Sequence, residues 1–386
     1  MQDLPTTRPR GGPMTVPDQA VPDGALPMMA SLRTFQDYHW LMLKVFYDAV
    51  LDAHGTAGLA QLAAGMRQAG VFRGTAMRDQ PASFVAGRGP AQLVEHWDTA
   101  EWQLGAEDGT LRVTAEGPTL TLTLPEAPGR AYLADLLGDV DAVAALAAYW
   151  APLLDGVAEG YGSGVAIEVD DPTVRPWGLR ITGPDRVEQA PRLGSRTADP
   201  IRMVEVNRRT TGLLAAMQMY VTKALIDTFD ASGEETVRRA AYRFGADRGS
   251  VIRERILALG KPLTMANFAS TDGLQERDPG EAVFVFKERQ HISDGAYYLD
   301  CTYCPLAEVW ATEGPEGLRL GYLFDSSNHR GLFQSYNPST EVRWTSVKSR
   351  GDHVCRFRFT VPEFLTDNDP TPEEFDNAPV HDSRGP

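Results

Sequence analysis

Cysteine is scarce in this sequence. Its 386 residues include three, Cys301, Cys304 and Cys355, and none lies before residue 301. Three cysteines cannot build the disulfide framework of a small secreted domain, so we expect a reducing, cytoplasmic location. Long apolar runs are also absent, because no segment has the roughly 20 consecutive apolar residues of a membrane-spanning helix. We therefore expect no membrane partner.

Positive charge is in short supply as well. The chain has 37 Lys and Arg against 52 Asp and Glu, for a formal net charge of −15. Nucleic-acid binding requires a concentrated basic surface, so this balance argues against a nucleic-acid partner and against an anionic bilayer. Hydrophobic residues make up 42% of the chain, which is ample for packed cores. At this length we expect two domains.

Three segments have the composition of disordered chain. Residues 1–30 form a proline-rich leader, residues 183–200 a polar linker, and residues 365–386 an acidic tail. Few large apolar residues occur in them, so burial cannot offset the entropy lost on ordering. The folded residues therefore fall into two blocks, 31–182 and 201–364.

The two blocks share one pattern of expected elements: two helices, strands, a further long helix and two closing strands. The expected helices are 35–53, 56–70 and 140–160, then 203–229, 234–259 and 315–336. The expected strands are 111–114, 119–124, 166–169 and 178–182, then 282–287, 296–303, 342–347 and 354–361. Long helices on a small antiparallel sheet in each block indicate an α+β fold.

Identical residues recur in the two blocks at a nearly constant separation. The pairs are Lys44 and Lys223, Asp48 and Asp227, Tyr161 and Tyr336, and Arg180 and Arg358. Two α+β domains can share an element order by chance, but the agreement in order, spacing and identity favours an internal duplication. We predict two tandem copies of one ligand-binding domain, either a monomer with an intramolecular pseudo-dimer or a homodimer.

The chemistry-bearing residues are concentrated in the second block. Trp150 and Trp177 stand in the first block where Asp325 and Cys355 stand in the second. We therefore predict a degenerate, structural first copy and a functional second copy with a pocket for a small molecule. Bulky aromatic side chains would fill the equivalent space in the first copy.

Asp325 and His329 are four residues apart on an expected helix, so they share one face. A carboxylate beside an imidazole orients the ring and makes it a general base for water. A solvated helix pair worth a few tenths of a kcal/mol is the alternative. The same spacing would suit two ligands of a metal, but two are not enough, and we predict neither a metal nor a cofactor.

Cys304 precedes Pro305 where a strand is expected to give way to a helix. A thiol at a helix N-terminus has a lowered pKa and is a candidate nucleophile, although a free cysteine is also commonly a small buried hydrophobe. Cys301 and Cys304 form a C-x-x-C pair, which leaves redox or metal use open. Cys355 alternates with Phe357 on a strand and is interpreted as structural.

Further residues of the second block are expected around the pocket. Arg343 is interpreted either as a structural ion pair or as the anchor of a substrate carboxylate. Tyr298, His291 and Glu308 are predicted to line the pocket and contact the substrate. Gly351 and Asp352 have the composition of a tight turn and are predicted to be structural.

Taken together, Cys304-Pro305, the helical Asp325, Arg343 and the closing Gly351-Asp352-x-x-Cys355-x-Phe357 resemble the L-2-amino-thiazoline-4-carboxylic acid hydrolase family. That family is similar to the vinyl-reductase-type and NO-binding ligand domains. The resemblance covers residues 203–362. Where the family has a cysteine shortly before the helical aspartate, this sequence has Leu323 and Phe324.

The resemblance implies hydrolysis of a non-peptide carbon–nitrogen bond in a small, cyclic, carboxylate-bearing molecule, in keeping with specialised metabolism. Water or Cys304 would attack a C=N or amide carbon, while Asp325 and His329 move protons and Arg343 holds the carboxylate. Two alternatives remain: a non-catalytic sensor or carrier, and a biosynthetic isomerase or cyclase that uses the same pocket.

Overall fold

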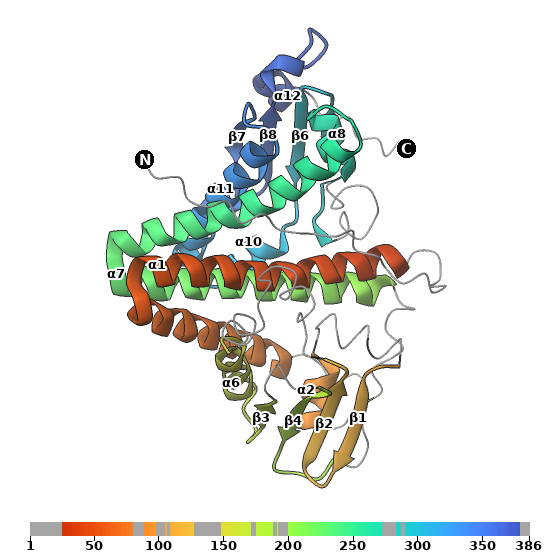
Figure 1. Ribbon diagram of the computed structural model, residues 1–386, viewed down its shortest axis with the longest axis vertical. Coiled ribbons are helices and arrows are strands. Elements are labelled where there is room, and N and C mark those ends of the chain that lie inside the picture. The colour runs from red at the N-terminus through yellow and green to blue at the C-terminus, as the bar shows by residue number, and fades with distance from the viewer. Residues whose placement is uncertain are drawn as a thin grey trace. The chain divides into compact units, whose positions relative to one another are not determined.

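The computed structural model describes residues 25–79, 89–97, 105, 109–126, 148–170, 175–187, 191, 200–271, 283–286 and 290–378 (Figure 1). Most of the predicted leader, most of the predicted linker and residues 140–147 of a predicted helix lie outside this part of the chain. The fold is α+β, as predicted, with helices packed on two four-stranded antiparallel sheets. None of the helices in the described ranges has the length and apolar composition needed to cross a membrane.

Two compact units make up the chain. Unit 1 comprises Met1–Leu26 and Met66–Asp199, and unit 2 comprises Pro27–Gly65 and Pro200–Pro386. The division differs from the predicted blocks in one segment, because residues up to Gly65 group with the C-terminal half. Unit 2 is therefore assembled from two separate stretches of sequence.

The two longest helices are each bent at a residue with positive φ. Helix α1 spans Ala25–Asp79 and is interrupted at Gly55, where φ is 56°. Helix α7 spans Pro200–Ala258 and is interrupted at Asp230, where φ is 48°. L-residues rarely adopt this conformation, so the helical hydrogen bonding stops there and the axis changes direction. The predicted breaks, after residue 53 and after residue 229, are confirmed.

Unit 1 packs helices on one face of a sheet with strand order β1-β2-β4-β3. Strand β2, with the sequence TLTLTL, buries Leu120, Leu122 and Leu124 while its threonines are only partly buried, as a period of two requires. The elements are α2 (Pro90–Glu95), β1 (Arg112–Glu116), β2 (Thr119–Leu124), α6 (Trp150–Tyr161), β3 (Ala166–Val169) and β4 (Trp177–Thr182). Trp177 of β4 is buried in the core of this unit.

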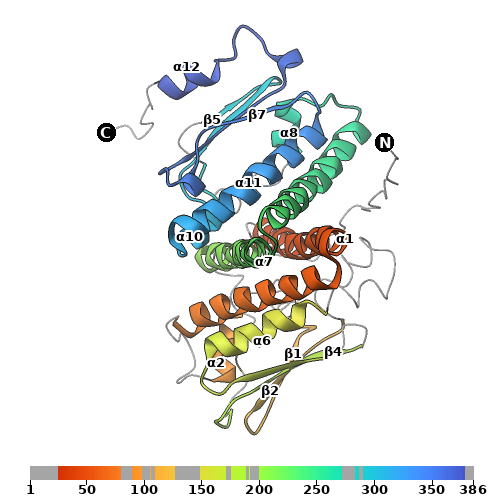
Figure 2. The same cartoon turned by 90° about the vertical axis from the view of Figure 1, so that its left-hand side faces the viewer.

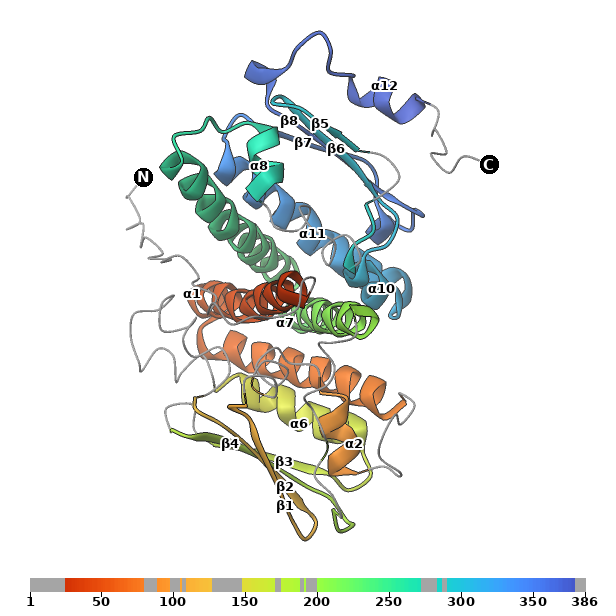
Figure 3. The same ribbon diagram turned by 90° about the vertical axis from the view of Figure 1, so that its right-hand side faces the viewer.

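Unit 2 has a second antiparallel sheet with strand order β5-β6-β8-β7, curved over helix α11 (Figures 2 and 3). Its elements are α8 (Met265–Thr271), β5 (Gln290–Ile292), β6 (Ala296–Cys301), α10 (Pro305–Ala311), α11 (Gly314–Tyr336), β7 (Glu341–Ser346) and β8 (Cys355–Thr360). The predicted strand 282–287 is wrong for the described residues 283–286, where Val285 forms only an isolated bridge with Tyr303. The edge strand is β5 instead.

Helix α11 packs against the second half of α7 at backbone contact distance. A Cβ added to Gly245 would lie 1.9 Å from the carbonyl oxygen of Asn328, and one on Gly331 would lie 2.0 Å from that of Tyr242. Glycine is therefore required at both positions, because any side chain would push the helices apart. This close approach fixes the position of the α11 residues that face the sheet.

The C-terminal segment, residues 362–378, is folded, so the prediction of a disordered tail is wrong for residues 365–378. A short 3₁₀ turn (η2, Pro362–Phe364) leads to helix α12 (Pro372–Asn377), which has a Thr371–Glu374 capping box. Helix α12 lies on the face of the sheet opposite α11 (Figures 2 and 3). Phe375 packs against Tyr298 with ring centroids 5.5 Å apart.

Arg358 of β8 explains why this acidic segment is ordered. Its side chain is fully buried, and its guanidinium binds the carboxylates of Asp300 on β6 and Asp376 on α12. A buried cation is costly unless its donors are paired, so the segment gains a charge-assisted contact that composition alone does not reveal.

Candidate functional site

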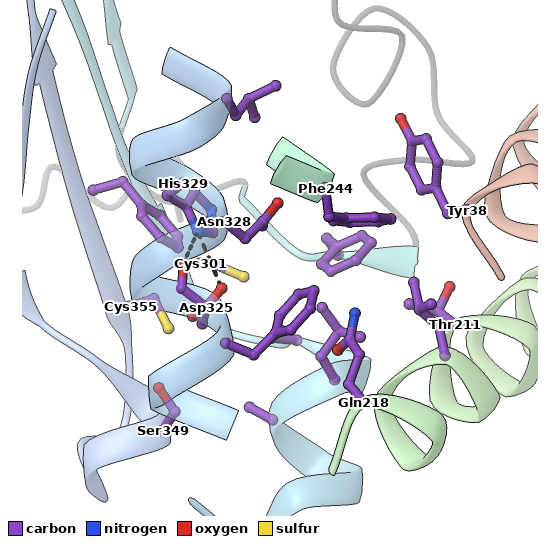
Figure 4. A pocket seen from close by; sticks show the side chains of 18 of the residues that line it. Tyr38, Thr211, Gln218, Phe244, Cys301, Asp325, Asn328, His329, Ser349 and Cys355 are labelled. Atoms are coloured by element: carbon purple, nitrogen blue, oxygen red, sulfur yellow. Dashed lines mark hydrogen bonds and ion pairs between the residues drawn. The ribbon is translucent and has the colours of Figure 1, made fainter. Parts of the chain in front are cut away.

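Unit 2 contains a partly open cavity of about 130 Å³ between the inner face of its sheet and helices α1, α7, α10 and α11. Its wall is dominated by aromatic side chains: Phe35, Phe244, Phe284, Phe286, Trp310, Phe324, Phe333, Phe357 and Phe359. Polar residues are few and come from different elements (Figure 4). An apolar enclosure with a few placed polar groups is typical of a small-molecule site.

Asp325 and His329 lie together in this cavity, on adjacent turns of α11 (Figure 4). The His329 Nδ1 atom is 3.1 Å from Oδ1 of Asp325 and 2.9 Å from its backbone oxygen. Both neighbours are hydrogen-bond acceptors, so Nδ1 carries the proton of the neutral ring. The Nε2 atom is then left with its lone pair and can accept a proton.

The His329 ring is held by aromatic neighbours on both sides. Trp344 meets it edge-on with centroids 5.2 Å apart, and Phe357 stacks on it at 5.1 Å. Asp325 is only 8% exposed, so its carboxylate is withdrawn from bulk water. A ring whose rotation is restricted and whose tautomer is set by a buried carboxylate has the geometry of a general base.

All three thiols also line the cavity. Cys301 and Cys355 are register partners on β6 and β8, and Cys304 is the residue before α10. Burial, followed by the nearby Asp325 carboxylate, raises the pKa of Cys304 to about 12. The expected lowering is wrong, because the backbone N–H groups of Leu306 and Ala307 only partly offset these two effects.

The other two thiols are also protonated at neutral pH. Burial is the largest cause that raises the pKa of Cys301 and of Cys355, and the neighbouring cysteines add to it. Cys355 is buried in the apolar core of unit 2 and accepts a hydrogen bond from the Lys348 N–H at 3.3 Å. In the part of the chain that the structure describes, no three His, Cys, Asp or Glu side chains are placed to hold a metal ion.

Three predicted substrate-binding residues lie on the opposite face of the sheet. Arg343 Nη1 donates to Glu373 Oε1 at 3.0 Å and is half exposed. Tyr298 packs on Phe375, and His291 is 2.9 Å from Asp369. Alternation along the strands explains this placement, since Trp344 and Tyr297 point inward and their neighbours must point outward.

Glu308 and the turn residues also lie outside the cavity wall. Glu308 is exposed and 3.3 Å from Lys348 Nζ. Gly351 has a φ of 93°, and the Asp352 carboxylate accepts the Val347 N–H at 2.7 Å, which lowers the pKa of Asp352. A left-handed glycine and this hydrogen bond account for the Gly-Asp pair as a turn.

The cavity residues that were not anticipated from the sequence include Phe35, Tyr38, Gln218, Arg248 and Asn328. Asn328 follows Asp325 by three residues on the same helix, and that spacing could have identified it. Nothing comparable points to the others, because α1 and α7 reach the cavity only through tertiary packing. Phe35 and Tyr38 come from a helix some 170 residues before the rest of the site.

Together, the α+β fold and the cavity indicate a ligand-binding domain. Within that class, residues 212–359 match the family model for L-2-amino-thiazoline-4-carboxylic acid hydrolase, so the predicted resemblance is confirmed for those residues. The match includes Asp325, His329 and the three cysteines but not the α1 residues of the cavity wall. No curated protein and no solved structure matches the chain.

Proposed function

We propose that unit 2 hydrolyses a non-peptide carbon–nitrogen bond in a small, cyclic, carboxylate-bearing molecule. The observation that carries the proposal is the Asp325–His329 pair. It lies in a cavity lined by aromatic side chains and within the residues that match the hydrolase family. General-base hydrolysis requires a base that is held next to the bound substrate, and a carboxylate that orients the base.

Water is the nucleophile that the site supports. His329 Nε2 accepts a proton from a water molecule as the oxygen attacks the carbon of a C=N or amide group. Asp325 holds Nδ1–H and stabilises the imidazolium that forms, and His329 then returns the proton to the departing nitrogen. Cys304 is a poorer nucleophile, because its pKa of about 12 leaves little thiolate at neutral pH.

Replacement of Asp325 tests the proposal. Asp325→Asn keeps the shape of the side chain but can present an N–H to His329 Nδ1, which would place the imidazole proton on Nε2. We expect turnover to fall by about a hundredfold to ten-thousandfold while ligand affinity is retained. Turnover is measured by mass spectrometry on L-2-amino-thiazoline-4-carboxylate and related cyclic amidines. Asp227→Asn, on an exposed Lys223 ion pair, is the matched control.

A non-catalytic sensor or carrier is the second candidate. Two observations favour it: the pKa of all three cavity thiols is raised, and Leu323 and Phe324 stand where the family has a cysteine. A sensor would bind ligand without any turnover in the wild type, and Asp325→Asn would change affinity alone. Near-normal turnover in Asp325→Asn would instead show that another group is the base.

We also propose that the two units arose by duplication of one domain. The strand orders β1-β2-β4-β3 and β5-β6-β8-β7 correspond one to one in chain order. The positive-φ breaks at Gly55 and Asp230 occupy equivalent places in α1 and α7. This correspondence supports a common origin of the two units.

Equivalent tyrosines make equivalent hydrogen bonds in the two units. At the end of α6, the Tyr161 hydroxyl donates to the carbonyl oxygen of Gly89, the residue before α2, at 3.2 Å. At the end of α11, the Tyr336 hydroxyl donates to the carbonyl oxygen of Thr264, the residue before α8, at 2.7 Å. A long-range contact of the same atoms between corresponding elements supports the proposed duplication.

A further inference from the structure

Among the described residues that line the cavity, Arg248 on the second half of α7 is the one with a permanent positive charge. Its guanidinium carbon lies 4.4 Å from the centroid of the Tyr38 ring and 5.3 Å from that of Phe244. Its Nη1 donates to Asn328 Oδ1 at 3.3 Å. Two aromatic rings and an amide therefore fix the plane of the guanidinium before any ligand arrives.

The charge of Arg248 is not neutralised within the described chain. No carboxylate of the described residues pairs with it, and its Nε atom is buried without a hydrogen-bond acceptor. A guanidinium has five N–H donors, and burying one of them without an acceptor is unfavourable. An arginine held in this state can bind an anion that the described residues do not supply.

Two further polar atoms in the cavity wall lack partners. Gln218 is 1% exposed and its Oε1 has no donor, while Ser349 is 3% exposed and its Oγ has no partner. Both residues line the cavity with Arg248. Buried polar groups are normally satisfied, so three orphaned polar groups around one cavity indicate that a ligand completes them.

Asn328 connects Arg248 to the Asp325–His329 pair. It lies three residues after Asp325 on α11, which is about 4.5 Å along the helix axis. An anion bound by Arg248 therefore places the rest of a small ligand within reach of His329. The cavity wall beyond these groups is aromatic and favours a planar ring.

We propose that Arg248 binds the carboxylate of a planar, ring-containing ligand in unit 2, with Tyr38 and Asn328 as its positioning residues. This assignment rests on the proposed function for the identity of the reacting group, but it concerns binding alone. It gives Arg248 the anchoring role that the sequence suggested for Arg343, whose side chain lies on the other face of the sheet and pairs with Glu373. A planar guanidinium binds a carboxylate through two parallel, charge-assisted hydrogen bonds.

Matched acid and amide probes test the assignment on the full-length protein. Calorimetry compares L-2-amino-thiazoline-4-carboxylate with its carboxamide, and indole-2-carboxylate with indole-2-carboxamide. We expect the wild type to bind at least one acid about tenfold or more tightly than its amide. Arg248→Met, which keeps apolar volume, should lose this preference while its affinity for the amide stays within about threefold.

Two control variants separate the cavity arginine from arginines elsewhere. Arg243→Met removes an exposed arginine of α7 that pairs with Asp247, and Arg343→Gln removes the arginine on the opposite face of the sheet. Both should retain the acid preference. If Arg248→Met does not fold, as judged by circular dichroism, Arg248→Gln decides by the same criterion.

Three results would overturn the assignment: no acid preferred by the wild type, a preference that survives in the Arg248 variant, or a preference lost in Arg343→Gln. Asp325→Asn should keep the acid preference, because Asp325 does not contact the carboxylate in this arrangement. Absence of turnover together with an Arg248-dependent preference would reject the hydrolase proposal and support this one. The two ideas therefore fail separately.

Discussion

At the residue scale, the strongest effect in the cavity is the suppression of thiol ionisation. Burial and the carboxylate of Asp325 raise the pKa of Cys304 to about 12, although two backbone N–H groups point at its sulfur. The position of Cys304 before a helix therefore did not predict the direction of its pKa shift. Desolvation and a like charge outweighed the helix terminus.

Alkylation kinetics test the state of Cys304. Because the thiolate fraction rises with pH up to the pKa, the rate of Cys304 alkylation by iodoacetamide should rise about tenfold per pH unit between pH 7 and 10. Peptide mapping by mass spectrometry follows this residue separately from Cys301 and Cys355. The unfolded protein is the control and should level off near pH 8.5. A plateau near pH 7 in the folded protein would restore Cys304 as a nucleophile.

The sequence predicted Asp325 and His329 as site residues but did not predict Arg248. Spacing on one helix suffices to pair two residues four apart, so α11 and its dyad were accessible to pattern reasoning. The side on which Arg343 lies was also accessible, because Val342 and Trp344 are apolar and strand residues alternate. Arg248 and Tyr38 meet only in the tertiary fold, and no local pattern indicates that contact.

At the element scale, the breaks in α1 and α7 differ in cost. Gly55 adopts positive φ without a steric penalty, whereas Asp230 has a Cβ that crowds the backbone. The local period of apolar residues predicted both breaks to within a few residues. It could not predict that one of them is strained.

Glycine at the α7 break should stabilise the protein. Asp230 is exposed and makes its turn at φ 48°, so Asp230→Gly removes strain of about 1–3 kcal/mol against a glycine entropy cost of about 0.5–1 kcal/mol. We expect a net gain of about 1 kcal/mol in the free energy of unfolding, measured by urea titration. Asp227→Gly, three residues earlier within the helix, should lose about 1 kcal/mol. Equal losses in both variants would contradict the prediction.

The C-terminal segment should respond to acid through Asp369. Burial would raise the pKa of this carboxyl, but hydrogen bonds from Ser293, His291 and Thr366 outweigh it and lower the pKa to about 2. A depressed pKa stabilises the fold above the ordinary carboxyl pKa near 4, and this contribution is lost as pH falls through about 2.

Asp369→Asn isolates that contribution. The variant should be less stable than the wild type at pH 7, with the difference constant down to about pH 4 and shrinking between pH 4 and 2. Chemical unfolding at several pH values measures it, and Asp367→Asn is the control, since Asp367 shows none of these hydrogen bonds in the described chain. A difference that grows below pH 4 would contradict the assignment. Composition predicted disorder for residues 365–378, because it does not reveal the tertiary ion pair between Arg358 and Asp376.

At the scale of the whole molecule, unit 2 needs residues from both ends of the chain. Phe35 and Tyr38 of α1 form part of the cavity wall, and His39 Nε2 lies 2.8 Å from the carbonyl oxygen of Thr210. Burial of this ring lowers the pKa of His39 to about 4. The order of the elements was predictable from the sequence. The assignment of residues 27–65 to unit 2 was not, because the local sequence pattern does not show which helices pack together.

Removal of residues 27–65 should therefore prevent unit 2 from folding stably. Residues 200–378 expressed alone should lack cooperative unfolding and expose the apolar face that α1 covers. Addition of a 27–65 peptide in trans should restore a cooperative transition, followed by circular dichroism and heating. A peptide with Phe35→Ser and Trp40→Ser is the control and should not. Cooperative unfolding of 200–378 by itself would show that α1 is dispensable.

Because residues 27–65 belong to unit 2, this unit cannot finish folding until the C-terminal strands have been synthesised. This helix leaves the ribosome early, but the strands that complete its unit end at Thr360, about 295 residues later. At about 5–20 residues per second, its apolar face waits roughly 15–60 s for its partners. During that interval the nascent chain presents an unburied amphipathic surface, which is the kind of segment that ribosome-associated chaperones shield.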